Sequence, residues 1–254
     1  MNTNVQNSAE IIAVVGASGS GKGARIKYDL LAPKPKRLLV WDFMREYADF
    51  GQVTESLADV ARAIATKENF RLIYRPIAEN GGPDEKVLKK KFARFCEIAM
   101  QCRDTTVVVE ELSFVTTPSW APGAWRAVNV TGRHRGLRVI GATQRPALVD
   151  KTFFGLATLV TCGRLMYEND EKAMAAVLRV ETHMLSDMPG LAFIERDQES
   201  KETRAGVVPF PAKLVKAAPE FDEKGRPGLR AKLAAAHAWQ KKLEQGDPPK
   251  AAKP

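Results

Sequence analysis

Short apolar runs alternate along the chain with longer stretches in which apolar residues recur at helical spacing. Residues 10–15 (EIIAVV), followed at once by glycines, are typical of a buried parallel strand. Similar runs predict further strands at 37–41, 70–74, 105–109, 137–142, 159–162 and 191–194. Helical spacing predicts helices at 22–31, 54–67 (with Thr54 as its cap), 83–102, 124–131, 168–180 and 229–243. This alternation predicts an α/β fold: a mostly parallel sheet that helices cover on both faces.

The pattern also predicts how the chain is divided. Residues 10–212 carry the alternating elements and are expected to form one domain, preceded by a flexible N-terminus at 1–9. From residue 213 the chain becomes a basic C-terminal extension, helical at first and then rich in Pro, Lys and Ala, and we expect its end to be disordered. A turn is predicted at 80–83 (NGGP).

The glycines after the first strand stand at the spacing of a phosphate-binding loop. Such a loop needs glycines so that successive backbone N–H groups can turn toward phosphates, a helix N-terminus, and a lysine that reaches the β- and γ-phosphates. The predicted nucleotide-binding residues are Gly16, Ala17, Ser18, Gly19, Ser20, Gly21, Lys22, Gly23 and Ala24. They lie between a predicted strand and a predicted helix, which is the context that the motif requires.

This loop lacks one group. The residue after the lysine is usually Ser or Thr, whose hydroxyl binds Mg²⁺, but here Gly23 and Ala24 follow Lys22. The phosphate cradle needs only the backbone and the lysine, and Mg²⁺ readily keeps water ligands. We therefore predict that the nucleotide binds and is hydrolysed, with a lower affinity for Mg²⁺ or a slower rate.

Two acids end the strand VVVEEL, residues 107–112, as in a Walker B segment. A buried strand would place the first carboxylate beside the phosphate loop. We predict that Glu110 holds Mg²⁺, directly or through water, and that Glu111 orients or deprotonates the attacking water.

A third segment, GRHRGLRVIGATQRP at 132–146, contains a predicted strand flanked by polar residues. Gln144 follows the strand, where its amide could contact the γ-phosphate or the attacking water as a sensor. Arg133 and Arg135 precede the strand and could project to the nucleotide of a neighbouring subunit or lie at the surface.

Together these segments resemble the FtsK/HerA superfamily of P-loop DNA-pumping ATPases. The resemblance rests on GASGSGKG, VVVEEL, RHRGLRVIGATQRP and the following LVTCGRLMYENDEKAM (159–174), and it covers roughly residues 11–194. It implies a RecA-like core, a ring of identical subunits that is often a hexamer, Mg²⁺-dependent ATP hydrolysis and movement of DNA through the ring. It also implies an arginine that acts between subunits, for which Arg133, Arg135 and Arg164 are the candidates.

Length narrows the resemblance. The 254 residues leave no room for the membrane spans and winged-helix domain of FtsK or the barrel of HerA, and no apolar run approaches the ~20 residues that a spanning helix needs. The N-terminus has no signal-peptide pattern. The chain therefore most resembles the genome-packaging ATPases of tailless, membrane-containing phages. That resemblance implies double-stranded DNA and a capsid or portal-vertex protein as partners, and a location in the host cytoplasm or on the virion.

Charge and composition leave alternatives open. The net charge of +9 fits a nucleic-acid partner, but the basic face of the helix at 83–102 and the basic tail are equally typical of solvated surfaces. The basic residues in question are Lys86, Lys89, Lys90, Lys91 and Arg94 in the helix, and Lys232, Lys241, Lys242 and Lys250 in the tail. The three cysteines and three histidines show no metal-ligand spacing and predict no disulfide framework.

Three other functions remain compatible with the sequence. One is a Zot-like phage morphogenesis or export ATPase, which would need a membrane partner. Another is a small-molecule phosphotransferase, since Gly-Lys-Gly at residues 21–23 also occurs in adenylate kinases. The last is an assembly protein that binds nucleotide without hydrolysing it.

Overall fold

A mixed, mostly parallel sheet organises the chain. The computed structural model describes residues 10–76 and 84–245, and its nine strands follow the order β3-β4-β2-β5-β6-β1-β7-β8-β9. The strands are β1 (Ile11–Val15), β2 (Arg37–Trp41), β3 (Gln52–Thr54), β4 (Phe70–Tyr74), β5 (Thr106–Val109), β6 (Arg138–Thr143), β7 (Leu159–Gly163), β8 (Ala192–Asp197) and β9 (Thr203–Val207). The predicted α/β fold is confirmed.

The chain divides into two compact units. The first comprises residues up to Ala13, Lys34–Thr143 and Leu148–Thr158, and the second comprises Val14–Pro33, Gln144–Ala147 and the chain from Leu159 onward. Strand β1 begins in the first unit and ends in the second. The predicted domain bounds at 9/10 and 212/213 stay a prediction.

The first unit holds the parallel part of the sheet. Strand β2 pairs in parallel with β4 on one side and β5 on the other, and β5 pairs in parallel with β6. The register sets Trp41, the last residue of β2, opposite Val109, the last residue of β5. Because parallel strands end at the same edge, the polar residues that follow them, Asp42 and Glu110, are neighbours at that edge.

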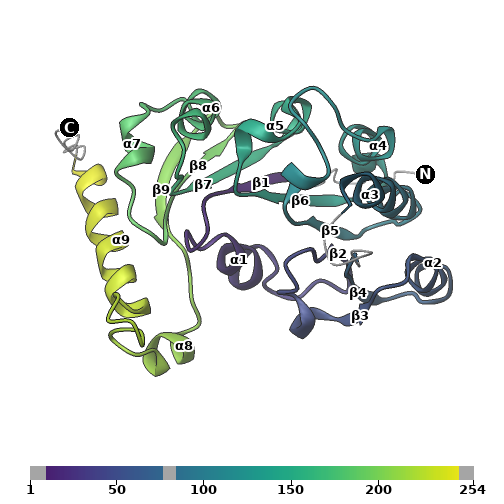
Figure 1. The fold of residues 1–254 in the computed structure, drawn as a ribbon, viewed down its shortest axis with the longest axis horizontal. Helices are drawn as coiled ribbons and strands as arrows, with labels where there is room; N and C mark the ends of the chain where they lie inside the picture. The colour runs from purple at the N-terminus through teal and green to yellow at the C-terminus, as the bar shows by residue number, and fades with distance from the viewer. Residues whose placement is uncertain (1–9, 77–83, 246–254) are drawn as a thin grey trace, which may run out of the picture. The chain divides into compact units, whose positions relative to one another are not determined.

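Helices of the first unit cover an aromatic core. They are α2 (Leu57–Thr66), α3 (Glu85–Ala99), α4 (Gly123–Thr131) and α5 (Lys151–Leu156). The apolar face of α3 packs beside α4 (Figure 1). It brings Phe92 and Phe95 to within 5.2 and 5.5 Å of the Trp41 ring, measured between centroids. All three rings are fully buried, so α3 is fixed on the end of β2 that leads to the acids.

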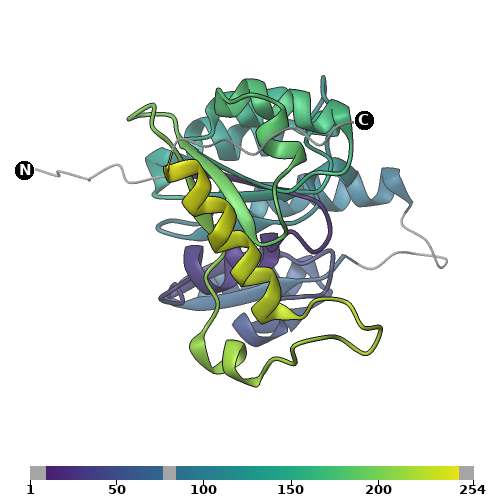
Figure 2. The ribbon, with the colours of Figure 1, turned by 90° about the vertical axis from the view of Figure 1, so that its left-hand side faces the viewer.

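The second unit pairs its strands antiparallel: β7 with β8 and β8 with β9. Its helices are α1 (Lys22–Arg25), which continues as the π-helix η1 (Ile26–Leu30), α6 (Glu168–Leu178), α7 (His183–Ser186), α8 (Ala212–Ala217) and α9 (Leu229–Glu244). Helix α9, yellow in Figures 1 and 2, runs along β9 and also contacts β8. Short 3₁₀ turns elsewhere are η2 (Ala48–Phe50), η4 (Leu112–Phe114), η5 (Gly132–Arg135) and η6 (Pro146–Leu148).

Several local predictions need correction. Thr54 is not a helix cap but the last residue of β3; the cap of α2 is Ser56, whose side chain accepts a hydrogen bond from the Asp59 amide at 3.2 Å. Helix α3 begins two residues later than predicted, because Asp84 caps it with its carboxylate. The predicted turn at 80–83, the flexible N-terminus and the end of the tail lie outside the described residues.

Two strands have no counterpart among the predicted elements. Strand β3 has three residues and β9 has the sequence TRAGV; both are partly exposed and neither shows an apolar run. Within residues 10–76 and 84–245, no helix is long and apolar enough to cross a membrane.

Candidate active site

The glycine-rich loop leads from β1 into α1, as predicted. Three of its glycines have positive φ angles, 153° at Gly16, 74° at Gly19 and 96° at Gly21, which other residues rarely adopt. Such angles let successive amides turn to one side and form a concave anion site. Ser18 and Gly19 are exposed at the loop's apex, and no heavy atom lies within 4 Å of where a Cβ of Gly19 would be. A phosphate can therefore approach the backbone here.

The underside of the loop is closely packed. Ser20 is buried, and a Cβ on Gly16 would lie 2.4 Å from its Oγ. A Cβ on Gly21 would lie 2.9 Å from Cγ2 of Val208. The Ser20 hydroxyl is buried without a hydrogen-bond partner among the described residues. Leaving a buried hydroxyl unpaired costs about 1–3 kcal/mol.

Arg164 lies directly after β7 and holds the loop through its backbone. Its carbonyl accepts a hydrogen bond from the Ala17 amide at 2.8 Å. The side chain of Arg164 is half-buried, and its Nε is buried without a partner among residues 10–76 and 84–245. The structure thus brings one of the three candidate arginines to the phosphate loop.

Gln144 follows β6 and belongs, with the next three residues, to the same unit as the loop. It is half-buried. The neighbouring Arg145 donates a hydrogen bond from Nε to Asp170 of α6 at 2.8 Å. The segment that carries the predicted sensor is therefore fixed to the first turn of α6.

The two acids after β5 are buried in the first unit. Glu110 is 6 % and Glu111 is 5 % exposed, so these are not solvated acids at the end of a strand. Glu111 has a φ angle of 50°, in the left-handed region that side chains other than glycine seldom occupy. Such a conformation costs on the order of 1–3 kcal/mol and is concentrated at functional sites. Both acids are therefore buried, and Glu111 in addition has a backbone conformation that is often found at functional sites.

The end of β2 places a tyrosine and a further acid beside Glu110. The Glu110 amide donates to the Trp41 carbonyl at 3.2 Å, and Asp42 accepts from the amides of Glu46 and Tyr47. Burial raises the pKa of the Tyr47 hydroxyl well above its usual value, and the negative charge of Glu110 raises it further. The hydroxyl therefore stays protonated near the acid that we predict to hold Mg²⁺.

Neither Asp42 nor Tyr47 was predicted to lie near the acids. The position of Asp42 could have indicated it, because Asp42 follows an apolar strand (RLLVW) just as Glu110 does. For Tyr47 no sequence feature indicated it, since nothing local distinguishes it from an ordinary core tyrosine.

Arg133 and Arg135 lie in the turn η5 of the first unit. Arg133 is exposed, whereas Arg135 is half-buried and its carbonyl accepts from the Asp104 amide at 2.9 Å. Of the basic residues on α3, Lys86, Lys90 and Arg94 are exposed. Arg94 pairs with Glu97 at 2.7 Å, and Lys89 pairs with Glu85. Intrahelical pairing of this kind fits the solvated-surface interpretation of the α3 basic face.

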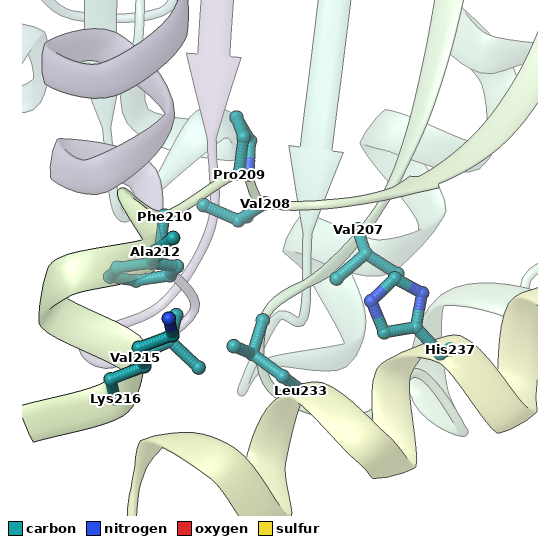
Figure 3. Close-up of a pocket in the computed structure, with 9 residues that line it drawn as sticks. All are labelled: Val207, Val208, Pro209, Phe210, Ala212, Val215, Lys216, Leu233 and His237. Carbon is teal, nitrogen blue, oxygen red and sulfur yellow. The ribbon is translucent and has the colours of Figure 1, made fainter. Parts of the chain in front are cut away.

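The second unit also contains an apolar cavity, one of whose lining residues, Val208, packs against Gly21 of the phosphate loop. The volume of the cavity is ≈ 560 Å³, and Figure 3 shows it between the segment that follows β9, helix α8 and helix α9. Its lining residues are Val207, Val208, Pro209, Phe210, Ala212, Val215, Lys216, Leu233 and His237. None of them is an acid, so the cavity offers Mg²⁺ none of the carboxylates that it prefers.

The described residues also contain no group of three or more His, Cys, Asp or Glu side chains that could hold a metal ion by themselves. A single carboxylate together with phosphate oxygens and water is, however, a common shell for Mg²⁺. Glu110 could supply such a carboxylate.

Comparisons with known proteins bear on the fold. No family model matches the sequence. Protein P9 of Pseudoalteromonas phage PM2 is 28 % identical over 188 residues, which are 70 % of this chain and 79 % of P9. The genome-packaging NTPase B204 of Sulfolobus turreted icosahedral virus 2, solved with AMPPCP, superposes with a TM-score of 0.62 at 18 % identity, over 80 % of this chain and 99 % of B204.

VirB4 of Thermoanaerobacter pseudethanolicus is also similar, with a TM-score of 0.61 at 11 % identity, over 80 % of this chain and 90 % of VirB4. At these identities the solved structures establish the fold. The resemblance to FtsK/HerA-type ATPases, and among them to genome-packaging ATPases, is confirmed at that level.

Proposed function

We propose that this chain, which has the fold of the genome-packaging NTPases, is an ATPase that moves double-stranded DNA into a viral capsid. The observation that carries the proposal is the glycine loop between β1 and α1, with its three positive φ angles and exposed apex. The similar chain of B204 has been solved with an ATP analogue, which supports ATP as the nucleotide.

The loop would bind the phosphates through its amides, the N-terminus of α1 and Lys22. Lys22 is the first residue of α1, so its side chain and the positive end of the helix act on the same anion. Buried Ser20 and the Ala17–Arg164 hydrogen bond keep the loop in this shape before the ligand arrives. Preorganised donors of this kind stabilise charge that develops during phosphoryl transfer.

Glu110 would anchor Mg²⁺, which neutralises charge on the β- and γ-phosphates when bound. Because Gly23 offers no hydroxyl, water would take the position that Ser or Thr usually fills. Tyr47 stays protonated beside Glu110 and can donate to one carboxylate oxygen, leaving the other for the metal. Glu111 would orient the attacking water and accept its proton.

Gln144 would sense the γ-phosphate, and an arginine would complete the site of a neighbouring subunit in a ring. Among the three candidates we favour Arg133 for the role between subunits, since it is exposed, whereas the backbone of Arg164 already holds the loop of its own subunit. A hexameric ring and docking at a capsid or portal vertex belong to the same proposal, and so does a place in the host cytoplasm or on the virion.

DNA as the substrate is supported by the genome-packaging role of B204 and by the net charge of +9. Contacts from lysine and arginine to phosphates carry little sequence information, as a motor that accepts a whole genome requires.

The first test is phosphate release from Mg-ATP with and without long double-stranded DNA. We expect stimulation by DNA that disappears in Glu111→Gln, which keeps the size of the side chain but removes the base. The matched control is Glu97→Gln on the exposed face of α3, which should keep full activity. A rate of hydrolysis that DNA does not change, or transfer of phosphate to a small acceptor such as AMP, would contradict the proposal.

A further inference from the structure

We propose that Asp170 is a positioning residue for hydrolysis: it holds the Gln144 segment in place from the first turn of α6. This inference rests on the proposed function, in which Gln144 senses the γ-phosphate. It assigns a role to a residue that lies 26 positions further along the chain and that contacts the sensor segment rather than the nucleotide.

Asp170 uses both carboxylate oxygens on this segment. Oδ2 accepts from Nε of Arg145 at 2.8 Å, and Oδ1 accepts from the amide of Ala147 at 2.9 Å. These partners lie one and three residues after Gln144. Two bonds to different points of a short segment fix its direction as well as its position, which a single contact would not do.

Burial makes these bonds strong and costly to lose. Asp170 is fully buried, so its charge is compensated by the groups that it accepts from rather than by water. The Arg145 guanidinium is also covered on one side, since it lies 3.9 Å from the centroid of the Tyr167 ring. The tyrosine comes three residues before Asp170, so the same short segment supplies both the carboxylate that binds Arg145 and the ring that packs against it.

The same segment also holds the phosphate loop. It begins at Arg164, whose carbonyl accepts the Ala17 amide, and reaches Asp170 at the start of α6. One piece of chain, residues 164–170, therefore fixes two parts of the nucleotide site: the loop at one end and the sensor segment at the other. All of these contacts lie within the second unit.

The key test compares Asp170→Asn with Gln144→Ala and with the double variant. We expect Asp170→Asn to lower kcat by up to about 100-fold, the size of effect that a misplaced catalytic group produces. Affinity for AMPPCP should stay within about threefold, because the loop that binds phosphates is unchanged. The double variant should be no slower than Gln144→Ala alone, since Asp170 acts through Gln144.

A second readout does not depend on hydrolysis. Exchange of the amide hydrogens of Gln144, Arg145 and Ala147 should be faster in Asp170→Asn than in the parent, because the segment loses its hydrogen bonds to a charged carboxylate. The control is Glu168→Gln, which removes an exposed carboxylate from the same turn of α6 and should change neither readout. Arg145→Lys serves as a milder variant with a partial loss, because lysine keeps the charge but not the planar geometry.

The outcomes separate the two hypotheses. A parent protein that binds AMPPCP but releases no phosphate under any condition would overturn the proposed function. Unchanged exchange at 144–147 in Asp170→Asn, or additive losses of kcat in the double variant, would overturn the positioning role while leaving ATP hydrolysis in place.

Discussion

At the scale of single residues, the most informative position is the one that departs from the usual loop. Gly23 is the second residue of α1 and supplies no hydroxyl where most such loops do. In the proposed function water fills that position, and Glu110, buried and next to a protonated tyrosine, is the acid that anchors the metal.

We predict that Gly23→Ser lowers the Mg²⁺ concentration needed for half-maximal ATP hydrolysis, because a hydroxyl would replace one water in the metal shell. The measurement is the rate of phosphate release across a Mg²⁺ titration at saturating ATP. Gly23→Ala is the matched control: it also replaces glycine by a better helix former, but without the oxygen. If serine and alanine shift the midpoint equally, the hydroxyl is not the cause and this explanation of the loop is wrong.

At the scale of elements, α1 is joined to the antiparallel strands by a buried charge network. Glu195 of β8 is 1 % exposed and accepts from Arg25 of α1 at 2.5 Å, from Thr161 of β7 at 2.7 Å and from Arg204 of β9. Arg25 also lies over the Phe193 ring, 4.5 Å from its centroid. One carboxylate therefore ties the helix that begins with Lys22 to three neighbouring strands.

We predict that Glu195→Gln destabilises the fold by about 3 kcal/mol, because it leaves the Arg25 guanidinium without its buried counter-charge. Urea unfolding at pH 7 measures this, with the exposed Glu202→Gln as the control. Retained stability in Glu195→Gln would mean that water or Asp29, which also pairs with Arg25, is enough to compensate the guanidinium.

The same carboxylate should make stability depend on pH. Burial alone would raise the pKa of Glu195, but hydrogen bonds from Thr161 and Arg204 and the charge of Arg25 outweigh it and hold the pKa below 4.5. The unfolded chain thus binds the proton more readily, so this contribution is complete above about pH 5 and is lost as the pH falls through the folded-state pKa. Wild-type protein should lose more stability between pH 6 and pH 3.5, roughly this window, than Glu195→Gln does.

At the scale of the whole molecule, the excess of positive charge should govern DNA binding. The last turn of α9 exposes Lys241 and Lys242, and Lys232 is exposed near the start of the same helix. We expect the logarithm of the DNA affinity to fall linearly with the logarithm of salt concentration, equally for unrelated duplexes.

Replacing Lys241 and Lys242 together by alanine should reduce that slope by about 0.9 for each phosphate contact that is lost. Fluorescence anisotropy with two duplexes of different sequence measures the slope. Lys172→Ala, on a lysine already paired with Glu168, is the control. A slope unchanged in the α9 variant would show that this helix does not contact DNA.

The sequence by itself determined the parts of this protein that depend on local pattern. Apolar runs located β1, β2, β4, β5, β6, β7 and β8, and glycine spacing located the phosphate loop, because burial and backbone freedom act on residues that are adjacent in the chain. The order of the motifs was enough to indicate the FtsK/HerA-type fold. The edge strands β3 and β9 were not predicted, because pairing with a neighbouring strand, rather than an apolar pattern, makes them strands.

Only the tertiary structure decided which polar groups meet. Arg25 and Glu195 are 170 positions apart in the chain, and Asp170 and Arg145 are 25 apart, yet each pair shares a hydrogen bond. Burial of Glu110 beside Tyr47 likewise depends on the register of β2 with β5. Charges and hydrogen bonds act through space, and their partners are set by the packing of elements, which no local stretch of sequence records.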